Sequence, residues 1–98
     1  PALYRHARAV IAPSLYEGFD LPASEALACG APVLASDIPV HREVLGDRVQ
    51  YVSPESIQEW TKALLRLEIK SPTTSCSGVR DWTAVARDTR HVYQMVLE

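Results

Sequence analysis

Short apolar runs alternate with helix-forming segments along this chain, and proline or glycine separates most of them. The apolar runs cover residues 9–13, 33–36 and 49–52. Each is too short for a helix, and each contains valine, which suits a strand covered on both faces. A helical segment lies between successive runs, so each strand can return parallel to the one before it. The sequence therefore predicts an α/β fold, with a short parallel sheet and flanking helices.

Proline and glycine set the ends of the first helices. Pro22 suits a first helical position and Gly30 a C-terminal stop, which predicts a helix over residues 22–29. Gly46 likewise ends a shorter helix expected over residues 40–45. Both helices follow a predicted strand, as the crossover segments of a parallel sheet do.

The next helix has a stronger start signal. Ser56 and Glu59 have the spacing of a capping box, in which each side chain accepts a hydrogen bond from the other residue's amide. Apolar residues then recur at helical spacing. This helix is expected to bury a stripe made of Ile57, Trp60, Leu64 and Leu67.

Residues 1–68 would hold the sheet. The rest of the chain divides into two parts. Residues 69–80 are rich in serine, threonine and proline and lack an apolar period, which predicts a flexible linker. Residues 81–98 are predicted to form one amphipathic helix, because apolar side chains recur at three- and four-residue steps. Its stripe comprises Trp82, Val85, Ala86, Val92, Tyr93 and Val96.

A sheet of this size has little to cover it. At 98 residues the chain has room for one domain, and short parallel strands leave an edge unpaired. Residues 1–6 resemble the end of a helix and not a signal segment. We therefore expect either a part of a larger domain or self-association through the open sheet edge.

Charge and composition exclude several classes of function. The net charge is −2 with acidic and basic residues intermixed, so no basic face is available for nucleic acid. No apolar run approaches the roughly 20 residues of a transmembrane segment. Cys29 and Cys76 are far apart in sequence, and neither has a partner at zinc-ligand spacing. We expect reduced thiols, a cytoplasmic location, no metal site and no nucleic-acid partner.

The segment from Glu17 to Glu25 runs from a strand end through a loop into a helix. Ligands of parallel α/β sheets gather at the carboxyl ends of the strands, and a helix N-terminus suits a pyrophosphate. Gly18 would let a ligand approach the backbone closely. Glu17 and Glu25 could accept hydrogen bonds from the vicinal hydroxyls of a sugar or ribose. The alternative is that Glu17 is a solvated loop residue and Glu25 only complements the helix dipole.

Residues 9–22 and 24–37 together resemble the donor-site signature of glycosyltransferase family 4, the group 1 glycosyltransferases of GT-B fold. Glu17 and Glu25 match the E-x7-E motif of that family. The similarity continues through residues 39–44 and is loose after about residue 67. A contiguous pattern of about 30 positions is far more specific than a short motif. The resemblance implies the C-terminal, donor-binding part of a Rossmann-like GT-B domain.

The resemblance also implies roles for individual residues. Glu17 would act as the catalytic residue, contacting donor-sugar hydroxyls and stabilising the transition state electrostatically, while Glu25 would hold the ribose. The donor would be a nucleoside-diphosphate sugar, transferred with retention of anomeric configuration and without cofactor or metal. Backbone amides would contact the sugar and diphosphate at Gly18, Phe19, Asp20 and Leu21.

The chain departs from the family at Asp20, where many relatives have a second glycine. The Asp20 side chain would either hydrogen-bond a donor hydroxyl or face solvent. The three histidines, His6, His41 and His91, are expected at the surface or at helix ends, outside the chemistry.

Other parts of such an enzyme are expected outside this chain. The family grips the diphosphate with an arginine and a lysine that would precede Pro1, and the acceptor binds to a separate N-terminal domain. The isolated chain is then expected to be inactive, and the full enzyme to be cytoplasmic or peripheral at a membrane. Helix 81–98 would pack on the acceptor domain or, alternatively, on the small sheet itself. The alternative function is a non-catalytic nucleotide-binding or interaction module of the same fold.

Overall fold

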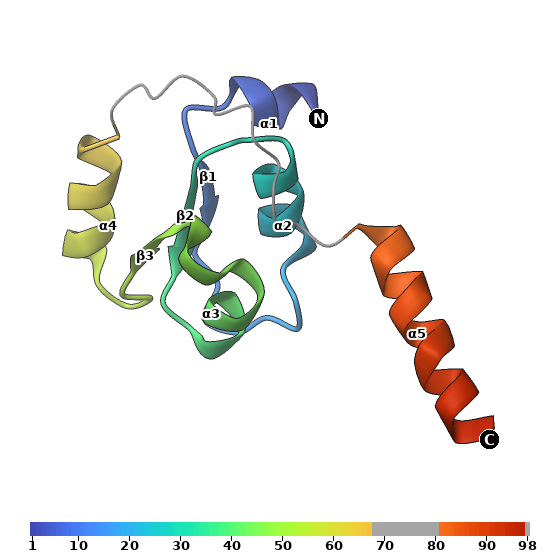
Figure 1. Cartoon of the computed structure of the whole chain (residues 1–98). Helices are drawn as coiled ribbons and strands as arrows, with labels where there is room; N and C mark the ends of the chain where they lie inside the picture. The colour runs from blue at the N-terminus through green and yellow to red at the C-terminus, as the bar shows by residue number, and fades with distance from the viewer. Residues whose placement is uncertain (68–80, 98) are drawn as a thin grey trace.

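A computed structural model describes residues 1–67 and 81–97 of the chain. The strands are β1 (Val10–Ala12), β2 (Val33–Ser36) and β3 (Gln50–Val52). Within these residues a short 3₁₀ helix, η1 (Gly46–Arg48), follows the third of five α-helices. The α-helices are α1 (Ala2–His6), α2 (Leu21–Ala28), α3 (Pro39–Leu45), α4 (Ile57–Leu65) and α5 (Trp82–Leu97) (Figure 1).

The sheet is parallel throughout, in the order β1-β2-β3. Every residue of β2 is buried, as expected of a central strand between two neighbours. Within the described residues, β1 and β3 are the edges. The predicted α/β fold, a short parallel sheet with flanking helices, is confirmed.

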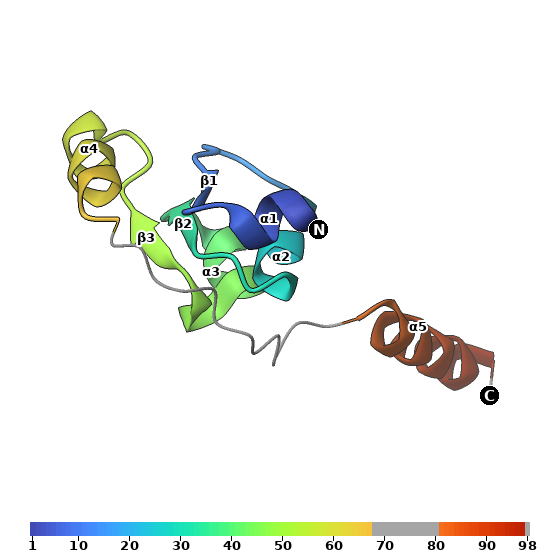
Figure 2. The same ribbon diagram turned by 90° about the horizontal axis from the view of Figure 1, so that it is seen from above.

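The helices cover the two faces of the sheet unequally. Helices α1, α2 and α3 lie on one face, and α4 lies on the other (Figures 1 and 2). Alanines dominate the interface between the sheet and α2, and their small side chains let α2 approach the strands closely. On the α4 face, Ile11 is 44% exposed although it pairs with buried Leu34. The buried residues of the α2–α3 side are Ala12, Ala23, Ala26, Ala31, Val33, Ala35 and Leu45.

Helices α2 and α3 end near Gly30 and Gly46, as the sequence predicted. Gly30 follows α2 with φ 77°, and Gly46 follows α3 with φ 57°. Both values lie in the left-handed region that glycine reaches without a steric cost.

Helix α4 corrects two sequence-based expectations. The Ser56 hydroxyl accepts a hydrogen bond from the Glu59 amide, but the Glu59 carboxylate accepts from the Ser53 amide, three residues before the cap. The predicted stripe is also rotated, because Ile57 is exposed and Ala63 is buried in its place. Trp60, Ala63 and Leu67 face Leu34 and Val52 of the sheet. The spacing of the large apolar residues did not show that Ala63, between Trp60 and Leu67, would be buried.

Helix α5 spans most of the predicted range 81–98, but none of its residues is buried. Trp82, the first residue of its apolar stripe, is 76% exposed. The alternative that this helix packs on the small sheet is therefore wrong. The predicted linker at 69–80 lies outside the described residues. None of the helices within residues 1–67 and 81–97 combines the length and the hydropathy of a membrane-spanning segment.

Candidate functional site

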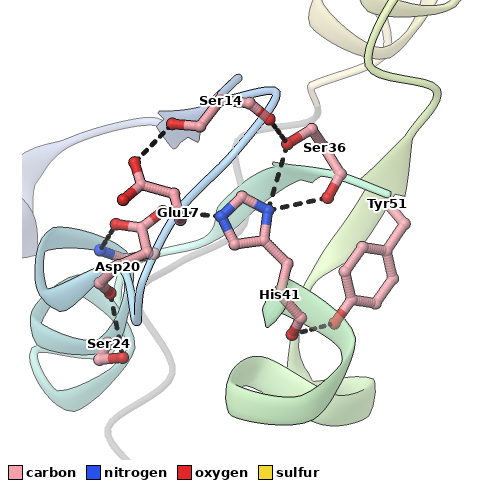
Figure 3. A network of polar contacts seen from close by, with 8 residues as sticks. Ser14, Glu17, Asp20, Ser24, Ser36, His41 and Tyr51 are labelled. Atoms are coloured by element: carbon pink, nitrogen blue, oxygen red, sulfur yellow. Dashed lines mark hydrogen bonds and ion pairs between the residues drawn. The ribbon is translucent and has the colours of Figure 1, made fainter. Parts of the chain in front are cut away.

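The candidate site is the loop from β1 to α2, at the carboxyl end of the sheet. The end of β2 and the start of α3 lie beside it, so three segments distant in sequence meet there (Figure 3). Crossover connections of a parallel sheet bring these segments together, because each strand ends at the same edge. The loop carries Glu17 and Gly18, and α2 carries Glu25.

Glu17 is half-buried and held in place from within the loop. The Ser14 hydroxyl donates a hydrogen bond of 2.6 Å to Glu17 Oε1 (Figure 3). A short hydrogen bond to a carboxylate is stronger than one between neutral groups, so it restricts the side chain. Glu17 is thus only partly open to solvent, and the hydrogen bond to Ser14 sets its orientation.

Gly18 is exposed, and its conformation does not require glycine. Its φ is not among the positive values, and a Cβ placed on it would meet nothing within 4 Å. The protein itself therefore leaves the space over Gly18 open. The neighbouring Phe19 is also exposed at the surface of the loop.

The Asp20 side chain is buried, and both expectations for it were wrong. It is 8% exposed, so it neither faces solvent nor reaches out to a ligand. Oδ1 accepts a hydrogen bond of 3.1 Å from the Ala23 amide and so caps α2. Oδ2 lies 2.9 Å from Nε2 of His41. Only the backbone amide of Asp20 is left for the predicted donor contact, which stays a prediction.

His41 was expected at the surface or at a helix end; it lies in the first turn of α3 but is fully buried, with 0% exposure. Pro39 starts α3, which directs His41 two residues later toward the loop after β1. No motif in the sequence links positions 20 and 41; only the topology brings them together. His6 and His91 are exposed, as predicted.

Tyr51 of β3 fixes the other side of α3. Its hydroxyl lies within hydrogen-bond distance of two carbonyl oxygens, 2.9 Å from that of His41 and 2.7 Å from that of Gly46. The guanidinium of Arg42 lies 3.8 Å from the centre of the Tyr51 ring, a cation–π contact. Burial raises the pKa of Tyr51, so its hydroxyl stays protonated as a donor.

Glu25 is exposed in the second turn of α2. The Tyr4 hydroxyl donates a hydrogen bond of 3.4 Å to its Oε2. Burial and the neighbouring Glu25 carboxylate raise the pKa of Tyr4. The first turn of α2 contains no acidic residue, so the explanation of Glu25 as a first-turn partner of the helix dipole is wrong.

The N-terminus of α2 is less open to an anion than the sequence implied. Asp20 takes the Ala23 amide with its carboxylate and the Ser24 amide with its carbonyl oxygen. Pro22 has no amide hydrogen to offer. An anionic ligand would therefore meet the amides of the loop before α2 more readily than those inside its first turn. Among residues 1–67 and 81–97, no three His, Cys, Asp or Glu side chains cluster as metal ligands would.

Known proteins resemble this chain over the segment that contains the site. The profile of the family described as "Glycosyl transferases group 1" matches residues 1–76. The O-antigen chain mannosyltransferase RfbU of Salmonella typhimurium is 44% identical over 67% of this chain and 19% of its own length. The MMP alpha-(1->4)-mannosyltransferase of Mycolicibacterium hassiacum is 36% identical over 98% of this chain and 26% of its own.

A further relative, the O-antigen chain mannosyltransferase B of Escherichia coli, is 39% identical over 67% of this chain and 17% of its own length. The chain thus spans between about a sixth and a quarter of the length of these relatives. No solved structure matches the chain.

Proposed function

This chain belongs to the group 1 glycosyltransferases, and from that premise we propose that it forms the donor-binding part of a retaining enzyme of GT-B fold. Its ligand would be a nucleoside-diphosphate sugar, and its place the C-terminal domain. The named relatives are mannosyltransferases, so mannose is the first sugar to test. The acceptor would bind to another domain, and the chain alone would not catalyse transfer.

The observation that carries the proposal is the fixed carboxylate of Glu17 beside an open backbone at Gly18. Ser14 orients the carboxylate, and the space above Gly18 is open to a ligand. Carboxylates accept paired hydrogen bonds from sugar hydroxyls. Because Gly18 has no Cβ, a bulky diphosphate can approach the backbone of the loop at this residue. We assign donor-sugar binding and transition-state stabilisation to Glu17.

We assign the nucleotide ribose to Glu25, one helical turn beyond the loop. Its carboxylate is exposed and has the Tyr4 hydroxyl beside it. The loop between the two glutamates would supply amides to the sugar and diphosphate, with no metal or cofactor needed. The amides in question are those of Gly18, Phe19, Asp20 and Leu21.

Titration calorimetry tests these assignments separately. The chain is titrated with UDP, GDP and ADP, and with the mannose and glucose conjugates of each. We expect one base to bind, with a dissociation constant of about 1 mM or lower. Glu25→Ala should weaken the diphosphate and its conjugate alike, whereas Glu17→Ala should weaken only the conjugate.

Glu43→Ala is the matched control, because Glu43 is also an exposed glutamate at the fifth position of a helix, α3. It should bind as the wild type does. Equal binding of free diphosphate and conjugate, unchanged in Glu17→Ala, would instead favour a nucleotide-binding module without catalysis. A folded chain that binds none of these compounds would contradict the donor-site assignment.

A further inference from the structure

Both ring nitrogens of buried His41 face oxygen atoms that accept hydrogen bonds. Nε2 lies 2.9 Å from Asp20 Oδ2, and Nδ1 lies 2.8 Å from the carbonyl oxygen of Ser36. A carbonyl oxygen can only accept, so Nδ1 must carry a hydrogen. The Nε2 contact then also needs a proton between the ring and the carboxylate. The two side chains are therefore joined by a buried hydrogen bond between Nε2 and Oδ2.

Ser36 extends this contact to the opposite end of the loop. Its hydroxyl donates to the carbonyl oxygen of Ser14, the residue whose side chain holds Glu17. The same Ser36 accepts from His41 through its own carbonyl oxygen. The loop is thus tied at Ser14 and at Asp20 to one buried Ser36–His41 pair (Figure 3).

The loop needs such ties because it ends in an unfavourable backbone conformation. Asp20 has φ 62° and ψ 69°, the left-handed region that a non-glycine residue seldom adopts. Such strain persists only where surrounding contacts over-determine it. Here the contacts come from the first turn of α2, from α3 and from the end of β2.

We propose that His41 is a positioning residue for the donor loop. It clamps Asp20 and, through Ser36, fixes Ser14, so that Glu17 and the amides of residues 18–21 are held in the conformation that a donor would meet. This inference rests on the proposed function for its ligand, but the clamp itself can be measured without one.

The experiment compares two substitutions at Asp20. Glycine adopts φ 62° without strain but removes both side-chain contacts. Asparagine also tolerates this region, and its amide group can cap Ala23 while donating to Nε2 of a neutral His41. A role limited to relieving strain predicts that Asp20→Gly is the better-ordered variant, whereas a clamp predicts that Asp20→Asn is.

Amide hydrogen exchange of residues 14–20 is measured in the full chain without ligand. Asp20→Gly should exchange faster by about tenfold, as expected on losing a hydrogen bond to a charged group, and Asp20→Asn should stay near the wild type. The ¹⁵N shifts of the His41 ring supply an independent signature. They should show Nδ1 protonated in both proteins, and Nε2 as a hydrogen-bond acceptor in Asp20→Asn.

His41→Ala is introduced in the Asp20→Gly background, where no buried carboxylate is stranded. If His41 holds residues 18–20 through Asp20, the double variant should exchange no faster there than Asp20→Gly does, whereas loss of the tie through Ser36 should still speed exchange at Ser14 and Glu17. His6→Ala is the control, because His6 Nδ1 also contacts a backbone carbonyl oxygen, at 2.8 Å, but on the exposed α1. It should leave the loop unchanged.

Binding of GDP-mannose, UDP-mannose and ADP-mannose then separates the two proposals. A wild-type chain that binds one of them, and an Asp20→Gly variant that binds it several-fold more weakly, supports the clamp. Equal exchange and equal binding in wild type and Asp20→Gly overturns the clamp and leaves the donor site standing. A wild-type chain that binds none of them overturns the proposed function, while the exchange rates of Asp20→Gly and Asp20→Asn still decide whether His41 clamps the loop.

Discussion

Asp20 and Glu17 are carboxylates three residues apart in one loop, and the protein treats them differently. Asp20 is buried and bonded to α2 and to α3, whereas Glu17 is half-buried and bonded to the Ser14 hydroxyl of its own loop. The same division separates His41 from its neighbour Arg42. His41 points into the protein toward Asp20, and Arg42 points outward to Asp37.

The difference separates groups that shape the site from groups that remain available to a ligand. A buried polar group must have its partners within the protein, since leaving it unpaired costs several times what its pairing adds. Interior substitutions should therefore lower the free energy of unfolding. Substitutions at the rim, at Glu17, Gly18 or Glu25, should change ligand binding and leave stability nearly unchanged.

The largest effect is expected for His41→Ala. It leaves the Asp20 carboxylate buried with only the Ala23 amide as a partner, and breaking a buried ion pair in this way costs about 3 kcal/mol. Urea denaturation followed by circular dichroism measures the loss. His6→Ala, at an exposed histidine, should change the free energy of unfolding by less than about 0.5 kcal/mol. If His41→Ala lowered the free energy of unfolding by as little, the Asp20–His41 pair would not be needed for the stability of the interior.

Two glycines extend the comparison to the backbone. Gly46 has φ 57° and ψ −139°, where any side chain is strained, so Gly46→Ala should lower the free energy of unfolding by about 2 kcal/mol. Gly18 lacks both strain and neighbours, so Gly18→Ala should leave stability unchanged and weaken binding of the diphosphate. Urea denaturation and calorimetric titration of both variants check this. The interior–rim division fails if Gly18→Ala is the more destabilising of the two.

The sequence predicted features that depend on local chemistry. The strand positions, the proline and glycine boundaries of α2 and α3, and the loop that carries Glu17 all follow from short stretches of residues. What it did not predict depends on contacts between distant positions. Asp20 and His41 are 21 residues apart, and only the parallel topology places them side by side.

Helix α4 shows a second limit of sequence reasoning. Periodicity marks large apolar residues, but the sheet selected Ala63 as the buried position and left Ile57 exposed. An alanine lets a helix approach the sheet closely, but the periodicity of large apolar residues does not identify which alanine will be buried. The roles of Glu17 and Glu25 stay predictions until a ligand is measured.

The smallest effect is expected at the rim of α3, where Arg42 bonds Asp37 through Nε and a terminal nitrogen, at 2.7 and 2.8 Å. Hydrogen bonding to Arg42 lowers the pKa of Asp37 below its ordinary value of 3.8. A carboxyl group with a lower pKa in the folded state stabilises the protein above that value. This stabilisation is lost as the pH falls through the folded-state pKa.

Urea midpoints measured from neutral pH down to about pH 3 should therefore fall slightly more for the wild type than for Asp37→Asn, which has no charge to lose. Both side chains are substantially exposed, and water screens such a pair, so the difference should be far smaller than that of His41→Ala. Salt should reduce it further, because exposed charges are screened within about 10 Å at 0.1 M ionic strength. Suppose instead that Asp37→Asn lowered the free energy of unfolding at neutral pH as much as His41→Ala does. In that case exposure would not explain the difference between the two sides of α3, and the distinction between interior and rim would have to be drawn elsewhere.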